Sequence, residues 1–158
     1  MIRIGYGTDI HRLVGGRPLI LGGVHIESNL GADGHSDADV LMHAATDAVL
    51  GALALGDIGS HFPNDEERWR NAPSAQFLEY AVGLIKEQGY AVVNLDSVVH
   101  IEMPKLRPFI GEMAANLAIA LGIGVDMVSV KAKTGEGVGP IGEGKAVRAE
   151  AVVLIEKS

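Results

Sequence analysis

The chain contains no cysteine among its 158 residues. Disulfides and thiolate metal sites are therefore excluded, and any zinc site has to be built from histidine and carboxylate side chains. Aromatic residues are scarce, at 4%, whereas hydrophobic residues make up 47% and glycine contributes 21 residues. This composition predicts a core of small aliphatic side chains on closely approaching backbones.

Positive charge is also in deficit, with 13 basic against 20 acidic residues and a net charge of −7. This balance argues against a nucleic-acid or anionic-membrane surface, so we expect neither partner. No apolar run reaches transmembrane length and the start, MIRIGYG, is unlike a signal peptide, so we expect a cytoplasmic protein. The length fits a single domain over residues 1–158.

Residues 36 to 56 predict a helix that starts at Ser36 as N-cap and ends at Gly56. Asp37 and Asp39 would fall in its first turn, where negative charge suits the helix dipole. His43 lies outside the apolar arc of this helix. The arc consists of Val40, Leu41, Ala44, Ala45, Ala48, Val49 and Ala52.

A short alternating strand at residues 2–7 leads into Thr8-Asp9-Ile10-His11. In extended backbone, Asp9 and His11 project to one side, and we expect Ile10 to turn toward the core. Together with His43 they supply three zinc ligands and leave a fourth position open, as catalytic sites do. Taken alone, each feature has an ordinary alternative, a solvated strand rim or a structural histidine.

The remaining pattern predicts strands at residues 18–26, 91–101, 128–134 and 147–155 and helices at residues 74–89 and 104–121. Ser74 would cap the first of these helices and Pro104 would open the second. This order predicts an α/β fold with a single sheet covered on one face by helices. The glycine-rich loop at residues 135–144 is typical of tight turns, with phosphate binding as the less common alternative.

Three separated segments carry a family resemblance: GTDIH, HSDADVLMHAATDAVLGALALGDIGSHFP and KAKTGEGVG. They resemble the 2-C-methyl-D-erythritol 2,4-cyclodiphosphate synthase family, the cyclases of the non-mevalonate isoprenoid pathway. The similarity extends from about Ile4 to Leu154 with matching order and spacing. The resemblance implies a homotrimer with active sites between subunits, the zinc ligands coming from one chain and the cytidine segments from the next.

The resemblance also implies a reaction. In this family the 2-phosphate of 4-diphosphocytidyl-2-C-methyl-D-erythritol 2-phosphate attacks the β-phosphorus, expels CMP and closes a ring. The nucleophile is already an anion, so positioning and charge stabilisation carry the catalysis. By resemblance, Asp9, His11 and His43 hold Zn²⁺, and Glu136 binds Mg²⁺ or Mn²⁺ together with substrate phosphates.

Two further residues, His35 and Thr134, match positions that stabilise the pentavalent transition state in the family. The matched substrate-binding positions are Ser36, Asp57, Ile58, Gly59, Phe62, Asn64, Pro104, Lys105 and Lys133. Asn64 departs from the aspartate that many relatives carry, which leaves its contact to the substrate open. His35 also has an ordinary explanation as a residue before a helix cap, Thr134 as a strand residue and Lys105 as a surface lysine.

Two other classes of function fit the same residues. A zinc-dependent hydrolase would use the three ligands to activate water, and it would have no need of cytidine. A trimeric nucleotide-binding regulator would use the metal structurally, but the sequence offers no credible fourth ligand. His25, His61 and His100 have no partner at ligand spacing, so we expect them to be structural or exposed. Arg68 and Trp69, in DEERWR, predict a mobile flap or a short solvated helix.

Glu143 and Lys145 stand where well-known relatives carry arginine and then glutamate, in a region associated with a central cavity that binds isoprenoid diphosphates. Because Glu143 places negative charge there, we expect this protein not to retain a prenyl diphosphate. Calorimetric titration with farnesyl diphosphate measures this directly. Micromolar binding would contradict the expectation.

Overall fold

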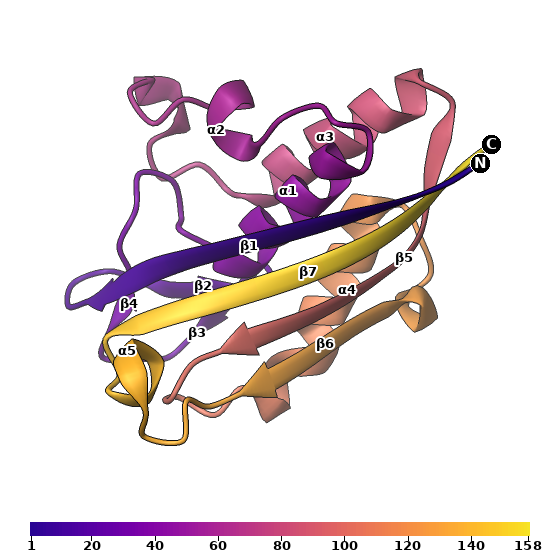
Figure 1. The fold of residues 1–158 in the computed structure, drawn as a ribbon. Helices are drawn as coiled ribbons and strands as arrows, with labels where there is room; N and C mark the ends of the chain where they lie inside the picture. Colours follow the sequence, from indigo (N-terminus) through magenta and orange to yellow (C-terminus); the bar gives the residue numbers. More distant parts are fainter.

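The computed structural model describes all of residues 1–158. Four strands come first along the chain, and the other three follow among helices and short 3₁₀ turns (Figure 1). The strands are β1 (Ile2–Val14), β2 (Leu19–Leu21), β3 (Val24–Ile26), β4 (Gly31–Ala32), β5 (Tyr90–His100), β6 (Val128–Lys133) and β7 (Ala146–Lys157). The α-helices are α1 (Val40–Ala52), α2 (Ile58–His61), α3 (Ala75–Glu87), α4 (Ile110–Leu121) and α5 (Gly139–Gly142). The 3₁₀ turns are η1 (Glu67–Trp69), η2 (Arg107–Phe109) and η3 (Val125–Met127).

The main sheet has five strands in the order β4-β1-β7-β5-β6. Strand β7 runs antiparallel to both of its neighbours, and β5 pairs with β6 in parallel through the crossover that contains α4. Helices α1, α3 and α4 lie on one face of this sheet (Figure 1). The predicted α/β class is therefore confirmed. None of the helices combines the length and apolar composition needed to cross a lipid bilayer.

The predicted strand at residues 18–26 is wrong as a single element. It is a hairpin of β2 and β3 that forms a separate two-stranded sheet. Gly22 and Gly23, between the two strands, have φ values of 56° and 72°, which favour glycine and turn the chain. The molecule consequently has one five-stranded sheet and a small second one.

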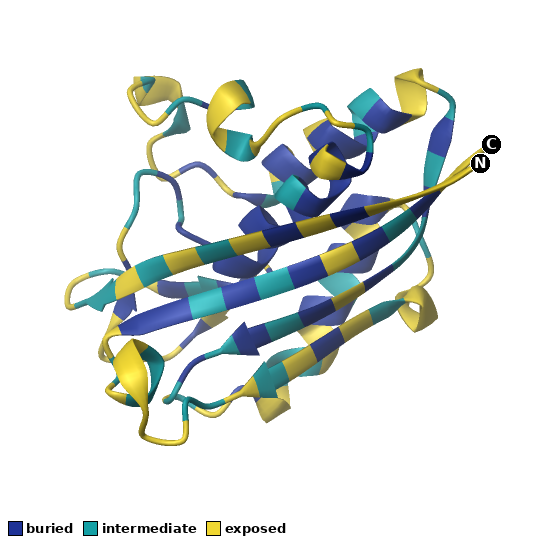
Figure 2. Ribbon diagram, viewed as in Figure 1, coloured by how far each residue is buried: buried dark blue, intermediate teal, exposed yellow.

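Strand β1 divides its side chains between the two faces of the sheet. Ile2, Ile4, Tyr6 and Ile10 are exposed on the open face, and exposed and buried residues alternate along β1 and β7 (Figure 2). The expectation that Ile10 turns toward the core is wrong, because this side chain is 56% exposed. The face toward the helices carries Gly5 and Gly7 instead.

Helix α1 lies directly on these two glycines. A Cβ atom on Gly5 would be 1.7 Å from the carbonyl oxygen of Ala48, and one on Gly7 would be 2.0 Å from that of Ala44. No side chain fits in such a gap, so the helix backbone approaches the strand as closely as sterics allow. The predicted small-residue packing is thus found where the helix crosses β1.

Several predicted helix boundaries differ from the structure. The first helix is capped by Asp39, not by Ser36, and it ends at Ala52 before Gly56. Ser74 occupies the N-cap position of α3, but its hydroxyl makes no capping bond. The third helix does not open at Pro104. Pro108 takes that role within η2, and α4 begins at Ile110.

Asp39 is a fully buried carboxylate that joins two segments. It accepts backbone N–H bonds from Met42 in α1 and from Gly22 and Gly23 in the β2–β3 turn, at 3.1, 2.9 and 2.7 Å. Burial raises the pKa of Asp39 to about 6, against the lowering effect of these N–H groups. The side chain therefore ties the hairpin to the start of α1.

We expect Asp39→Ala to lower the free energy of unfolding by about 3 kcal/mol, because three backbone N–H groups would lose their acceptor in a buried place. Urea denaturation measures the change. Asp126→Ala, which removes an exposed carboxylate, serves as the control. Equal midpoints for the two variants would contradict this role of Asp39.

Candidate metal site

Asp9 and His11 project from β1 toward α1, and His43 projects back from α1. One oxygen of Asp9, Oδ2, lies 3.0 Å from Nε2 of His11 and 3.0 Å from Nδ1 of His43. The three ligand atoms lie within 4.8 Å of one another. The structure thus brings together the three residues that the sequence predicts as metal ligands.

The second ring nitrogen of His11 fixes the tautomer of this residue. Its Nδ1 is hydrogen-bonded to the backbone carbonyl oxygen of Asp33. Since a carbonyl oxygen only accepts, Nδ1 carries the proton and Nε2 of the neutral ring has a free lone pair. That lone pair faces the acceptor oxygen of Asp9, so a proton or a metal ion has to lie between them for the contact to be favourable.

The pKa values of Asp9 and His11 are also shifted in the directions that favour a positive charge beside the Asp9 carboxylate. Burial alone would raise the pKa of Asp9, but hydrogen bonds and charge interactions with His11 and His43 outweigh it and lower the pKa to about 2. Burial would likewise lower the pKa of His11, but the Asp9 carboxylate raises it overall. Two nitrogens and one hard oxygen suit zinc and similar divalent ions, and three protein ligands leave a fourth position for another molecule.

A cavity of about 180 Å³ opens at the three ligand residues. Six other residues that the sequence assigns to the site line the same cavity: His35, Ser36, Ile58, Gly59, Phe62 and Asn64. His35 donates from Nε2 to the carbonyl oxygen of Glu66 at 2.9 Å, which holds its ring against the segment before η1. Most of the predicted site therefore lies in one place.

The aromatic wall of this cavity includes two residues that were not predicted from the sequence as part of the site. Trp69 and Phe77 line it together with Phe62, and the Trp69 ring packs edge-on against both phenylalanines, at centroid distances of 5.0 and 5.6 Å. The DEERWR stretch does contain a short helix, as one of the two predictions had it, but its tryptophan faces inward. A lone tryptophan in a charged segment was the available signal.

The remaining predicted residues lie elsewhere in the chain. Pro104, Lys105, Lys133 and Thr134 line a second cavity, also of about 180 Å³. Glu136 is exposed in the turn after β6, 3.5 Å from the Thr134 hydroxyl, and it lines neither cavity. Asp57 is also outside both, because its carboxylate caps α2 by accepting the N–H of Ser60.

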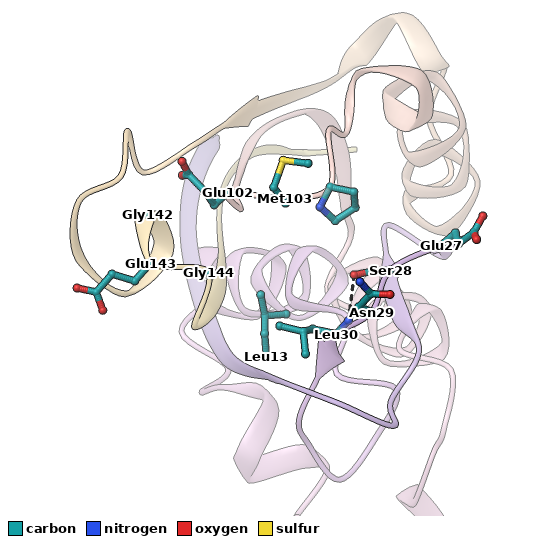
Figure 3. A pocket seen from close by; sticks show the side chains of 11 residues that line it. Leu13, Glu27, Ser28, Asn29, Leu30, Glu102, Met103, Gly142, Glu143 and Gly144 are labelled. Carbon is teal, nitrogen blue, oxygen red and sulfur yellow. Dashed lines mark hydrogen bonds between the residues drawn. The ribbon is translucent and has the colours of Figure 1, made fainter.

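A larger cavity of about 720 Å³ contains none of the predicted metal ligands (Figure 3). Leu13, Leu30 and Met103 supply its apolar lining, and Glu143 at its rim is directed away from it. Glu143 instead pairs with Lys145 at 2.7 Å. The charges of Glu143 and Lys145, which are reversed relative to the arginine and glutamate of relatives, thus form an ion pair with each other on the surface. Such exposed pairs contribute little to stability.

The other predicted histidines behave as expected, since none joins the metal site. His25 is exposed, and Nε2 of His61 donates to the carbonyl oxygen of Leu55 at 2.9 Å. His100 lies 3.4 Å from Glu150 on the open face of the sheet, in a group that also contains Tyr6 and Arg148.

Comparison with known proteins identifies the family of this chain. Residues 2–156 match the YgbB family. The sequence is 51% identical over 156 residues to the 2-C-methyl-D-erythritol 2,4-cyclodiphosphate synthase of Solibacter usitatus, covering 99% of this chain and 98% of that one. It is also 51% identical to the synthase of Salinibacter ruber, over 99% and 100% of the two chains.

Solved structures agree with these matches. A 2C-methyl-D-erythritol-2,4-cyclodiphosphate synthase bound to CDP gives a TM-score of 0.90 at 42% identity, over 98% of this chain and all of that one. The CDP complex of IspF from Plasmodium falciparum gives 0.87 at 38% identity, over 99% and 97%. The bifunctional IspDF of Campylobacter jejuni gives 0.95 at 37% identity, and there the chain corresponds to 43% of the longer protein.

The chain therefore belongs to the YgbB family. Its full-length relatives are 2-C-methyl-D-erythritol 2,4-cyclodiphosphate synthases. The prediction that the chain is an enzyme of this lyase class is confirmed by these comparisons.

We expect metal binding to weaken as the pH falls, because a proton on Nε2 of His11 competes with the metal and the folded protein holds that proton more tightly than a free histidine does. Affinity for Co²⁺, measured by its visible absorption, should level off above the raised pKa of His11 and fall by about tenfold per pH unit below it, as expected when one proton competes with the metal. His25→Gln, at an exposed position, should keep this profile. A pH-independent affinity would contradict the assignment of His11.

Proposed function

We propose that this chain converts 4-diphosphocytidyl-2-C-methyl-D-erythritol 2-phosphate to 2-C-methyl-D-erythritol 2,4-cyclodiphosphate and CMP, as a step of the non-mevalonate isoprenoid pathway. One observation carries the proposal: three acceptor atoms converge in a cavity lined by six of the residues assigned to the reaction. Family membership and the CDP-bound structures of relatives support the cytidine-linked substrate.

The proposed site holds two metal ions. Asp9, His11 and His43 would bind Zn²⁺, since the chain has no thiolate and offers one carboxylate and two imidazoles. Glu136 would bind Mg²⁺ or Mn²⁺ together with phosphate oxygens. When bound, the ions supply Lewis-acid polarisation and a template for phosphate oxygens.

The residues of the chain position the substrate and stabilise the transition state. The attacking phosphate is already ionised, so no general base is needed. His35 and Thr134 are proposed to donate to oxygens that gain charge in the transition state. Substrate contacts fall to Ser36, Asp57, Ile58, Gly59, Phe62, Asn64, Pro104, Lys105 and Lys133.

The proposal includes a homotrimer with sites between subunits. Within one chain, His35 and Thr134 line different cavities, so a single copy does not assemble the two proposed donors. The open face of the sheet exposes Ile2, Ile4, Tyr6 and Ile10, a surface that self-association would cover. Sedimentation equilibrium at three times the chain mass would support this assembly. We also propose a single catalytic domain over residues 1–158 and a cytoplasmic location.

The hydrolase alternative uses the same three ligands to activate water. It predicts turnover of an ester or amide and no dependence on cytidine. The regulator alternative predicts zinc binding without turnover. Assays of CMP release and of zinc content on the same preparation separate the three functions.

We expect His43→Ala to lose zinc and to reduce CMP release by at least about a hundredfold, because the remaining Asp9 and His11 do not hold the ion in place. Zinc content by mass spectrometry and CMP by chromatography provide the readouts. The matched control is His25→Ala, which removes an exposed imidazole and should leave both unchanged. Full CMP release by a zinc-free His43→Ala protein would rule out the mechanism.

A further inference from the structure

The ring of His43 makes a second set of contacts on the side away from Asp9. Its Nε2 lies 2.7 Å from the hydroxyl oxygen of Ser74, at the start of α3. Ser74 is fully buried and His43 is 9% exposed. The Ser74 hydroxyl contacts Oδ1 of Asp37, and the Ser74 N–H donates to Oδ2 of the same carboxylate at 2.9 Å.

The direction of the protons along this chain of contacts follows from the groups themselves. A carboxylate oxygen accepts hydrogen bonds, so the Ser74 hydroxyl gives its only proton to Asp37. The Ser74 oxygen then has lone pairs left for the imidazole, and Nε2 of His43 donates to it. Nδ1 is consequently left with a lone pair, and it is the nitrogen that lies 3.0 Å from Asp9 Oδ2.

Asp37 is itself fixed in this orientation. Its Oδ1 also accepts the backbone N–H of Asp39 at 3.1 Å, next to the cap of α1. Both of its oxygens therefore face N–H or O–H donors, and neither can supply a proton to Ser74 while the carboxylate is ionised.

The neighbouring hydroxyl of Ser36 does not compete with this arrangement. It lies farther from Nε2 of His43, at 3.2 Å, and it accepts the backbone N–H of Ala38 at 3.3 Å. It can serve as a second acceptor for the same Nε2 proton, which leaves the tautomer unchanged.

We propose that Asp37 and Ser74 are positioning residues of the metal site: the chain of contacts Asp37–Ser74–His43 holds the imidazole in the tautomer and orientation that present Nδ1 to the metal. The inference rests on the metal site of the proposed function and extends it. Histidine ligands commonly donate their other N–H to such a partner, which orients the ring and raises its basicity. For His11 that partner is the carbonyl oxygen of Asp33, and for His43 it is a serine backed by a carboxylate.

The first test needs no substitution. In ¹⁵N-labelled wild-type protein loaded with Zn²⁺, two-bond ¹⁵N–¹H spectra report which nitrogen of His43 carries the proton and which one binds the metal. The expected result is a proton on Nε2. A proton on Nδ1 would overturn the proposal.

The second test uses Zn²⁺ affinity, measured by competition with a chromophoric chelator. Ser74→Ala should raise the dissociation constant about 10- to 100-fold, since the outer partner of a ligand histidine is lost. Asp37→Asn should do the same and shift His43 toward the Nδ1–H tautomer, because an amide can donate to Ser74 and free its hydroxyl proton for Nε2. Unchanged affinity in both folded variants would overturn the proposal.

The matched control is Ser97→Ala. Ser97 is also buried, and its hydroxyl donates to a backbone carbonyl oxygen, that of Ser129, in the sheet. This variant should keep wild-type zinc affinity, so a loss shared by Ser97→Ala and Ser74→Ala would point to general destabilisation and count against positioning.

The outcome is separable from that of the proposed function. Wild-type protein that binds zinc with His43 in the expected tautomer, but releases no CMP, would overturn the cyclisation and leave the positioning role in place. Wild-type protein that binds no zinc would overturn both.

Discussion

The close contact between α1 and β1 is the constraint on which the rest of the structure depends. Gly5 and Gly7 let the helix backbone rest on the strand at Ala48 and Ala44. His43 precedes Ala44 by one residue, and Asp9 follows Gly7 by two, so the contact that packs the core also sets the spacing of the metal ligands. A larger residue at either glycine would push the helix away from the strand and separate His43 from Asp9.

The second constraint is electrostatic. The polar groups behind the ligands, a carbonyl oxygen at His11 and a serine backed by a carboxylate at His43, accept hydrogen bonds from the outer ring nitrogens. The inner nitrogens are thereby left as acceptors facing a carboxylate. Such a cluster of acceptors is unfavourable unless a cation lies between them, so the folded chain favours binding of a positive ion at this site.

The sequence predicted the structure correctly where local periodicity decides which face of an element a side chain occupies. Asp9 and His11 share a face because strands alternate, and this holds in the structure. The prediction that Ile10 faces the core was wrong because the packed face of β1 begins with Gly5 and Gly7. These glycines have no hydrophobic side chain that would indicate, from the sequence, that this face is buried. Ser36 and Asp39 are both good caps, and only the tertiary bonds of Asp39 to Gly22 and Gly23 select between them. Ser74 looked like a helix cap, and its contact to His43, 31 residues away in sequence, leaves no local trace.

The two faces of β1 have a consequence for how this strand can change over time. Its odd-numbered positions from Gly5 to His11 meet α1 or the metal site, and its even-numbered ones meet the open side. Inserting or deleting one residue between Gly7 and Asp9 would exchange the two sets, carrying Asp9 and His11 outward and Ile10 inward. Substitutions are easier at the even-numbered positions of this strand, but its length between the glycines and the ligands cannot change by a single residue.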